Sequence, residues 1–264
     1  MKHRRWTLAL VAGLLAAAMS LSACKKEDPG LAKLQRDGKL TVGVELREPF
    51  GVQTGSEVTG LDAELAQALC QELGIQAELV AIEPGKGGET LEAGQVQCLM
   101  GGVTADDAAL RELTTTAPYL LQQQCLVTRA STAKSYRSIE PFRKLKLAAV
   151  RGSAGAEAAA AQLPEATCIL VDTVEQALEA VDRGQVAAAV LALSVAGLRT
   201  GEGSDYAQLA VADGAALPKS AYVIALADDT FLKAISDAMV RLEEAGTIAS
   251  LAEEYGLGEA LIAG

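Results

Sequence analysis

Residues 145–191 read LKLAAVRGSAGAEAAAAQLPEATCILVDTVEQALEAVDRGQVAAAVL. Short apolar runs alternate in this stretch with segments in which apolar residues recur at helical spacing. The sequence predicts strand 145–150, helix 154–162, strand 168–171, helix 174–181 and strand 186–191. Strands that alternate with helices of this length form mainly parallel sheets covered by helices. The stretch therefore predicts an α/β fold.

The same alternation precedes this stretch, and a polar segment separates the two parts. Residues 129–138 (RASTAKSYRS) are polar, and we expect them to cross from a first unit into a second one. In the first unit we expect a helix at 61–73 that ends at Gly74, and strands at 40–44, 77–82, 96–100 and 125–128. After the second unit we expect a strand at 222–226 and helices at 230–244 and 248–255. The chain therefore contains two α/β units without a sequence repeat between them.

The N-terminal residues have the pattern of a secretory signal that ends in a lipid attachment site. Three basic residues lead into an apolar run from Trp6 to Met19, and the sequence LSAC ends at Cys24. This ending resembles a bacterial lipobox, which implies a signal peptide of residues 1–23, acylation of Cys24 and a lipidated tether of residues 24–30. A plain signal peptide and a short membrane helix are the alternatives, but the run is shorter than the ~20 apolar residues of a spanning helix. We therefore expect an extracytoplasmic protein that lipidated Cys24 anchors to the cell membrane.

Removal of the signal would leave an acidic chain without histidine. His3 and Trp6 are the only histidine and tryptophan of the 264 residues, and both lie in the signal. Their loss excludes Ser-His-Asp and Cys-His catalysis and histidine-ligated zinc. The remaining 34 acidic and 20 basic residues give a formal charge of −14, which repels nucleic acid. We therefore expect no nucleic-acid partner and a protein that is not an enzyme.

Motifs for cofactors and metals give no positive indication. Residues 85–88 (GKGG) lack the spacing of a phosphate-binding loop and the Ser or Thr that ends it. The acidic pairs 106–107 and 228–229 fit helix N-termini better than a metal site. We therefore expect neither a cofactor nor a bound metal. Four cysteines follow Cys24 without CxxC spacing, and their disulfide state stays open: Cys70, Cys98, Cys125 and Cys168.

Seven short motifs follow one another along the chain. They are GKLTVGV (38–44) with EPF (48–50), GLDAELA (60–66), LEAGQV (91–96) with GGVT (101–104), APY (117–119), AVRGS (149–153), AVDRGQVAAAV (180–190), and YVIA (222–225) with EAGT (244–247). No single motif is specific, but their common order along the chain is. In this order they resemble the motifs of the extracytoplasmic solute-binding proteins of the bacterial polar amino-acid ABC transporter family.

The resemblance implies a two-lobed clamshell of the type II periplasmic-binding-protein fold. Residues 31–124 and 222–264 would form lobe one and residues 129–217 lobe two, each a mainly parallel sheet flanked by helices. Two crossing segments would join the lobes as hinges. The ligand would bind in the cleft, where the carboxyl ends of strands and the amino ends of helices meet. The implied partners are a small-molecule ligand and an ABC transporter permease, and we expect a monomer.

Three ligand-binding positions of that family hold other residues here. The resemblance places a carboxylate-binding arginine at Ala109, an ammonium-binding acid at Ala192 and a stacking aromatic near Pro84. Arg111 is two residues away from Ala109, which is too far along a helix to face the same way unless the helix shifts its register. A charged ligand that is buried without partners costs several kcal/mol per ion. The departures therefore argue against a free α-amino acid held in the family's usual way.

Several residues near the predicted cleft remain as candidate ligand contacts. They are Glu45, Phe50, Gly102, Thr104, Arg151 and Ser153. Ser153 follows a glycine at a predicted helix start, where free N–H groups favour an anion or a carbonyl oxygen. Each candidate also has a structural alternative, such as a helix cap for Ser153 and core packing for Phe50.

These observations predict a membrane-anchored receptor that captures a small polar metabolite, amino-acid-like or an amine, and delivers it to an ABC importer. The ligand would bridge both lobes and so stabilise the closed state. Two alternatives stay open. One is a ligand-independent or sensory surface lipoprotein on the same fold. The other is a dehydratase-like enzyme in which Glu45 or Asp106 would transfer protons.

Overall fold

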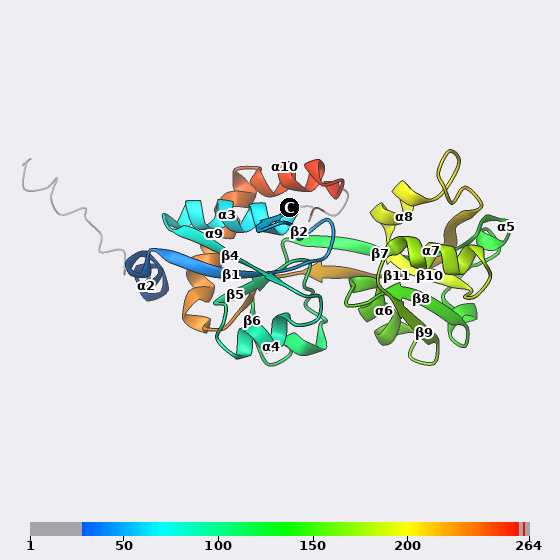
Figure 1. The fold of residues 1–264 in the computed structure, drawn as a ribbon, viewed down its shortest axis with the longest axis horizontal. Coiled ribbons are helices and arrows are strands. Elements are labelled where there is room, and N and C mark those ends of the chain that lie inside the picture. Colours follow the sequence, from blue (N-terminus) through cyan, green and yellow to red (C-terminus); the bar gives the residue numbers. More distant parts are fainter. Residues whose placement is uncertain (1–27, 259–260, 262–264) are drawn as a thin grey trace, which may run out of the picture.

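The computed structural model describes residues 28–258 and residue 261. They form two lobes, each built on its own five-stranded sheet, which lie side by side along the long axis of the molecule (Figure 1). The predicted signal peptide, Cys24 and residues 25–27 of the predicted tether lie outside the described residues. Among the helices that the structure describes, none is long and apolar enough to span a membrane.

The first lobe contains a mixed sheet with a parallel centre. Its strands, in spatial order, are β4 (Gln76–Ile82), β1 (Lys39–Glu45), β5 (Cys98–Met100), β12 (Ala225–Leu226) and β6 (Thr114–Thr115). β1 pairs in parallel with both of its neighbours, whereas β12 runs antiparallel to β5 and β6. The carboxyl ends of β1 and β5 therefore lie at one edge of the sheet. A short hairpin of β2 (Val52–Thr54) and β3 (Glu57–Thr59) follows β1.

Helices cover both faces of this first sheet. α3 (Leu61–Leu73), α9 (Leu232–Glu244) and α10 (Thr247–Glu254) lie on one face, and α4 (Gly87–Glu92) lies on the other (Figure 1). α2 (Pro29–Asp37) packs at the end of the lobe that is farthest from the second lobe. In α3 the leucines at 61, 65 and 69 recur at helical spacing and are buried against the sheet.

The second lobe contains a sheet with a parallel half and an antiparallel half. Its strands, in spatial order, are β11 (Leu209–Tyr222), β7 (Leu120–Arg129), β10 (Ala188–Ala192), β8 (Lys146–Val150) and β9 (Thr167–Val171). β8 pairs in parallel with β9 and β10, and β7 runs antiparallel to β10 and β11. Its helices are α5 (Ala130–Ala133), α6 (Ala154–Gln162), α7 (Val174–Asp182) and α8 (Leu193–Arg199).

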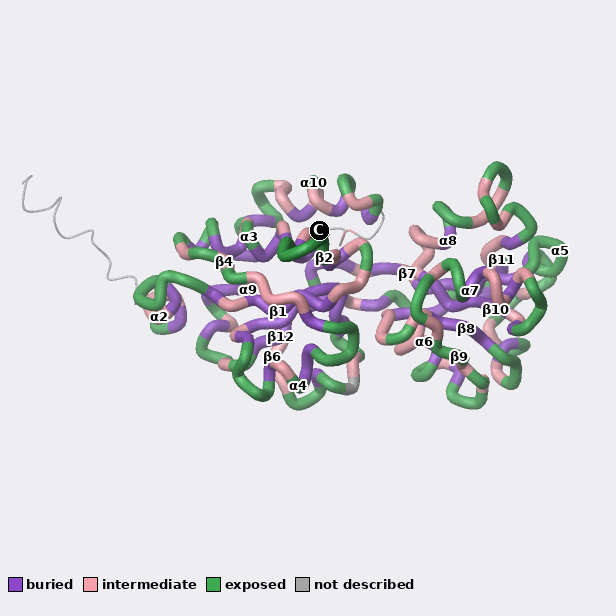
Figure 2. Tube along the Cα trace, viewed as in Figure 1, coloured by how far each residue is buried: buried purple, intermediate pink, exposed green. Residues whose placement is uncertain are grey.

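Two apolar cores cover the two faces of the second sheet. In β10, Ala189 and Leu191 join the core under α7, whereas Ala188 and Val190 join the core under α6. Side chains of a strand alternate between its two faces, so a strand covered on both sides is apolar at every position. Figure 2 shows the buried residues along the strands of both sheets and along β7 where it passes between the lobes.

The two lobes are joined by β7 and β11, which lie next to each other as paired strands (Figure 1). Leu120 pairs with Tyr222 at the end that meets the first lobe, and Arg129 pairs with Leu209 at the far end. The Tyr222 hydroxyl donates to Gln122 Oε1 at 2.7 Å, and Tyr222 also forms an isolated bridge with Thr104 of the first lobe. The connection between the lobes is therefore a pair of hydrogen-bonded strands, in which β7 is mostly buried and β11 is partly exposed.

The structure confirms the α/β class and the two-lobed architecture. The helices predicted at 61–73 and 154–162 begin and end as expected. The prediction that residues 129–138 cross between the units is wrong, because Arg129 already pairs at the far end of the second sheet. The strand expected at 125–128 begins at Leu120, and α2 begins at Pro29, inside the segment expected to be a tether.

The strand expected at 222–226 is two strands in different lobes. Tyr222 ends β11 of the second lobe, and β12 of the first lobe begins at Ala225. β11 is missed in the sequence because Gly214 and Pro218 interrupt its apolar pattern. The pairing with β7 shifts register at two places, between Val211 and Ala216 and between Ala216 and Lys219. Such irregularities remove the strict alternation by which a strand is predicted.

Candidate functional site

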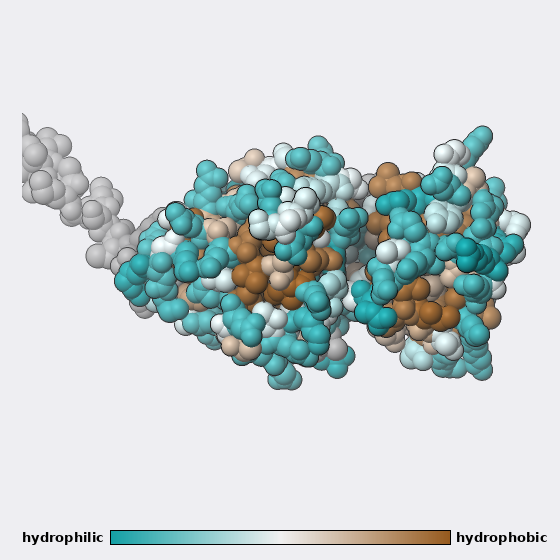
Figure 3. All heavy atoms as spheres, viewed as in Figure 1, coloured by the Kyte–Doolittle hydropathy of each residue, from teal (hydrophilic) through white to brown (hydrophobic). Residues whose placement is uncertain are grey.

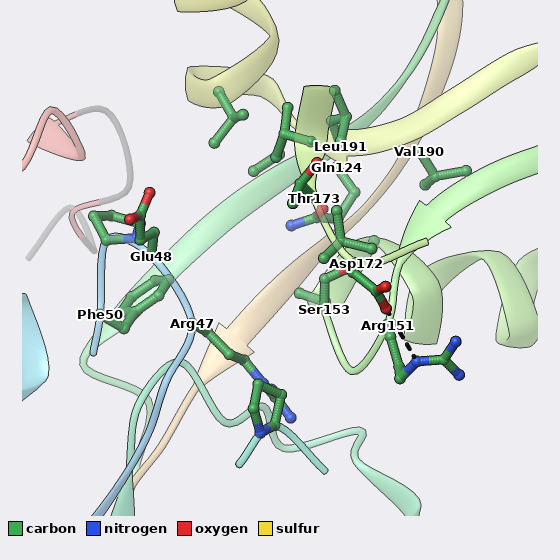
Figure 4. Close-up of a pocket in the computed structure, with 18 of the residues that line it drawn as sticks. Arg47, Glu48, Phe50, Gln124, Arg151, Ser153, Asp172, Thr173, Val190 and Leu191 are labelled. Carbon is green, nitrogen blue, oxygen red and sulfur yellow. Dashed lines mark ion pairs between the residues drawn. The ribbon is translucent and has the colours of Figure 1, made fainter. Parts of the chain in front are cut away.

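A cavity of about 440 Å³ lies between the two lobes. The first lobe contributes the loop after β1 and Pro84, the connecting strand β7 contributes two glutamines, and the second lobe contributes the segments that begin α6, α7 and α8. Figure 4 shows Arg47 and Phe50 on one side of this space, and Ser153, Asp172 and Thr173 on the other. Figure 3 shows the notch between the lobes at the surface. A ligand in this cavity would contact both lobes at once.

The wall of the first lobe is a tight turn after β1. The amides of Phe50 and Gly51 donate to the Arg47 carbonyl oxygen at 2.7 and 3.0 Å, and the Glu48–Pro49 peptide bond is cis. The Phe50 ring lies 4.6 Å from the Tyr222 ring, measured between centroids. Phe50 also packs on Gly102, where a Cβ would come within 2.6 Å of the ring and where φ is +72°. Both the space and the backbone therefore require glycine at position 102.

Arg47 is the most buried cation of the cavity wall, with 9 % of its side chain exposed. Its Nη1 donates to the Gly102 carbonyl oxygen at 3.1 Å, and its Nη2 lies 2.5 Å from Glu45 Oε2. Its Nε has no hydrogen-bond partner among the described residues. Glu45 in turn accepts from the amides of Gly85 and Gly87 at 3.1 and 2.8 Å. Burial raises the pKa of Glu45, and the Arg47 charge and the two amides oppose that rise.

Helix N-termini form the wall of the second lobe. Ser153 Oγ accepts from the Ala156 amide and caps α6, and Thr173 Oγ1 accepts from the Gln176 amide and caps α7, both at 3.2 Å. The first amides of a helix have no partner within the helix and carry its positive end. The N-terminus of α6 can approach the sheet closely because residue 155 is glycine, where a Cβ would come within 2.7 Å of the Val190 carbonyl oxygen.

The connecting strand places two glutamines in the cavity wall. Gln122 and Gln124 lie on the same face of β7, since side chains two residues apart in a strand point the same way. Gln122 Nε2 donates to Ser194 Oγ at 2.6 Å, and its Oε1 accepts from Tyr222. Gln124 is fully buried, and its Oε1 has no partner among the described residues. A buried polar atom left unpaired costs about 1–3 kcal/mol, which a ligand donor would recover.

The other two guanidinium groups of the wall, like that of Arg47, pair with a carboxylate. Arg151 Nε lies 3.7 Å from Asp172 Oδ1 (Figure 4), and Arg199 Nη1 lies 2.7 Å from Glu175 Oε1. Both pairs are about half exposed or more, so solvent screens them and each contributes little to stability. The charges of the wall are therefore nearly balanced.

Three of the predicted ligand contacts line the cavity: Phe50, Arg151 and Ser153. Two of the positions at which this chain differs from the family's ligand-binding residues, Pro84 and Ala192, also line it. The binding role of these residues stays a prediction. Ser153 does serve as the cap of α6, and Phe50 packs against the connecting strands as well as the cavity.

Glu45, Gly102, Thr104 and Ala109 do not line the cavity. Glu45 and Gly102 instead hold the Arg47 guanidinium, Glu45 by an ion pair and Gly102 by its carbonyl oxygen. Thr104 is buried, and its Oγ1 donates to a carboxylate oxygen of Glu157 on α6, which joins the first lobe to the second. The structure thus brings Arg47 and the two glutamines to the cavity, and the motif comparison had not marked any of these three as ligand contacts. Their only sequence signal was that they are polar residues near predicted strands: Arg47 follows the strand expected at 40–44, and both glutamines precede the strand expected at 125–128.

Two carboxyl groups with raised pKa values lie behind the cavity wall: Asp62 is fully buried, and Glu157 is partly buried. Burial raises the pKa of Glu157 to about 7. The hydrogen bond from Thr104 and the Arg47 charge lower it, and the Asp107 and Glu45 charges raise it. Burial also raises the pKa of Asp62 to about 6. Asp62 Oδ2 accepts from the Gly101 and Gly102 amides at 2.7 and 2.8 Å and so fixes the turn that carries Gly102.

The four cysteines that the sequence left open are free thiols in this structure. Burial raises the pKa of the Cys70 and Cys125 thiols to about 11 and about 12. Within residues 28–258, no group of three or more His, Cys, Asp or Glu side chains is arranged to hold a metal ion.

The family model of the bacterial extracellular solute-binding proteins, family 3, matches residues 40–258. The chain belongs to this family. The probable amino-acid-binding protein YxeM of Bacillus subtilis (strain 168) is 26 % identical over 261 residues, which cover 97 % of this chain and 96 % of that protein.

Solved structures show the same fold. The ancestral amino acid-binding protein AncCDT-1, a precursor of cyclohexadienyl dehydratase, has a TM-score of 0.68 and 25 % identity over 85 % of this chain and 98 % of its own. An amino acid ABC transporter substrate-binding protein from Streptococcus pneumoniae Canada MDR_19A, bound to L-arginine, has a TM-score of 0.67 and 22 % identity over 86 % of this chain and 97 % of its own. The family predicted from the ordered motifs is thus confirmed, and the cavity of this solute-binding protein lies between its lobes.

Proposed function

We propose that this solute-binding protein captures an amino acid or a similar small amine in the cavity between its lobes and delivers it to an ABC importer. The observation that carries the proposal is the cavity itself, because both lobes and the connecting strand contribute to its wall. Its volume of about 440 Å³ falls within the ~300–1,000 Å³ that is usual for small-molecule sites. The amino-acid-binding names of the relatives support this class of ligand.

The mechanism is a ligand-driven shift between open and closed arrangements of the lobes. A ligand that touches only one lobe binds both arrangements equally, whereas a ligand that touches both gains contacts only when the lobes are closed. The lobes are joined by paired strands rather than a loose linker, so we expect them to move as rigid bodies about β7 and β11. The closed form would then be the one that the permease recognises.

Lipidation at Cys24 would hold this receptor next to its importer. The lipobox-like sequence that ends at Cys24 supports the anchor. Two acyl chains anchor a protein stably, whereas one does so only marginally. The first described helix, α2, begins only a few residues later, at Pro29, so the first lobe would lie close to the membrane.

Neither alternative function gains support from the cavity wall. Glu45 and Asp106, the candidate acid–base groups of a dehydratase-like enzyme, do not line the cavity. A scaffold protein would need no ligand, yet the wall contains unpaired buried polar atoms on Arg47 and Gln124. A small-molecule receptor accounts for these atoms directly.

A ligand screen with the purified full-length chain tests the proposal. Thermal unfolding is measured with each standard L-amino acid, with the related amines, and without addition. A ligand at ~100-fold over its dissociation constant stabilises a protein by about 2.7 kcal/mol. At ~2–4 °C per kcal/mol for a chain of this size, the transition should rise by about 5–10 °C. If no amino acid or amine raises the transition, the proposed function is wrong.

A further inference from the structure

We infer that Arg47 binds the carboxylate of the ligand. This side chain then selects ligands that carry one carboxylate group, and an α-amino acid is the expected case. The inference rests on the proposed function and adds the residue and the chemical group that it recognises. Position 109, which the resemblance suggested for this role, holds an alanine that lies outside the cavity wall.

The Arg47 guanidinium keeps free donors on the edge that matches a carboxylate. A guanidinium has five N–H donors. Nη1 is occupied by the Gly102 carbonyl oxygen and Nη2 by Glu45, while Nε has no partner among the described residues. Nε and the second hydrogen of Nη2 together form the fork that binds a planar carboxylate through two parallel hydrogen bonds. A cation that is nine-tenths buried, lines the cavity and has an unused donor is a built binding group.

The surrounding residues hold this guanidinium in place before any ligand arrives. Gly102 and Glu45 fix its two Nη atoms, and the Gly85 and Gly87 amides fix Glu45 in turn. A preorganised group loses little conformational freedom on binding, which favours affinity. Glu45 therefore positions Arg47 and, since it is not in the wall, does not itself contact the ligand.

The N-terminus of α6 approaches Arg47 from the second lobe. A Cβ at Gly152 would lie 3.5 Å from Arg47 Nη2, so the guanidinium reaches the turn that precedes α6. Ala154 and Gly155 of the first turn line the cavity, and amides at this position favour an anion. A carboxylate between Arg47 and α6 would be held by both lobes, and lobe closure would then depend on it.

Gln124 provides a hydrogen-bond acceptor in the same cavity wall as Arg47. Its buried and unpaired Oε1 is a hydrogen-bond acceptor in the same wall, which suits an amino group of the ligand. A dianion such as phosphate does not fit, because Glu45 pairs with Arg47 and Glu157 lies nearby behind the wall. A ligand with one carboxylate and one amino group satisfies Arg47, α6 and Gln124 together.

The test compares acids with their amides on matched variants of the full-length chain. Calorimetric titration uses the standard L-amino acids, the carboxamide of each binder, and a set of small monocarboxylates without an amino group. The variants are Arg47→Gln, Arg47→Lys and the control Arg183→Gln. Arg183 directly follows α7, has 61 % of its side chain exposed and pairs with Glu179. Arg47→Lys keeps the charge opposite Glu45 and loses the fork, so it serves if Arg47→Gln fails to fold.

In the wild type and in Arg183→Gln, we expect the carboxamide to bind at least 100-fold more weakly than the acid. In the Arg47 variants, we expect the acid to lose at least 100-fold in affinity and to bind no better than the amide. Binding of the acid by a folded Arg47 variant within threefold of the wild type would overturn the inference.

The panel separates this inference from the proposed function. If only monocarboxylates without an amino group bind, and the binding depends on Arg47, the amino-acid proposal fails and the inference stands. If amino acids and their amides bind equally well to the wild type, the proposed function stands and the inference fails. If no carboxylate of the panel binds, the inference is wrong, and the amines of the thermal-unfolding screen then decide the proposed function.

Discussion

Replacement of Glu157 by glutamine should remove a pH dependence that is built into the contact between the lobes. Glu157 on α6 accepts a hydrogen bond from Thr104 of the first lobe, and burial raises its pKa from 4.5 to about 7. A change of one pKa unit corresponds to ~1.36 kcal/mol, so the ionised form costs the folded protein about 3 kcal/mol.

The sign of the effect follows from the raised pKa. Below pH 4.5 the carboxyl group is protonated in the folded and the unfolded chain, and the wild type pays no penalty. Between pH 4.5 and about 7 the unfolded chain ionises first, so wild-type stability falls as the pH rises. Glutamine is neutral throughout and still accepts from Thr104 through its amide oxygen. The variant should therefore equal the wild type near pH 4.5 and exceed it by up to about 3 kcal/mol at pH 8.

The assay is urea unfolding of the two proteins from pH 4.5 to 8, with the exposed Glu165→Gln as the control. The difference between the two curves isolates Glu157, because the other groups that titrate in this range, such as Asp62, are common to both. The protein can also relieve the penalty by opening its lobes, so small-angle X-ray scattering is measured over the same range. A flat difference curve together with a radius of gyration that does not change with pH would refute the reasoning.

Three further predictions concern the support of the cavity and the anchor. Gly102→Ala should lower the free energy of unfolding, measured with urea, by more than Gly38→Ala does. Both positions have φ of +72°, where a residue with a Cβ costs about 1–2 kcal/mol, but only at position 102 would the Cβ also clash with Phe50. Equal losses would contradict the clash. Tyr119→Phe removes the hydroxyl that donates to buried Asp62 at 2.7 Å and should lower the free energy of unfolding by about 1–3 kcal/mol, whereas an unchanged value would show that the bond adds nothing. Cys24→Ser should release the protein from the membrane fraction or leave it uncleaved without a change in ligand affinity, and an unchanged membrane fraction would argue against the anchor.

Much of the fold could be predicted because the buried apolar residues recur in the sequence with the period of a helix or a strand. α3 shows this, since its leucines recur at helical spacing and Gly74 ends it with φ of +74°. β11 does not, because Pro218, Gly214 and two shifts of register break its alternation. The boundary at 129–138 was misplaced for a related reason: polar residues at the far end of the second lobe resemble those of a linker.

The candidate site was predicted only in part because a cavity wall depends on tertiary contacts. Ser153 follows a glycine before a helix and could be placed from the sequence, and it lies in the wall. Thr104 follows a strand in the same way, but it turns toward Glu157 instead of the cavity. Arg47 and Gln124 have no local motif, and their importance appears only when their unpaired atoms are seen to be buried in one wall.

The central claim is that a small molecule occupies the cavity between the lobes, and native mass spectrometry tests it most directly. The full-length chain and the variant Ala192→Trp, whose new side chain would fill the cavity, are equilibrated with a mixture of the standard L-amino acids. The account predicts one bound small molecule per wild-type chain and none on the variant. A wild type without a bound molecule, or a variant that binds as much as the wild type, would contradict the claim.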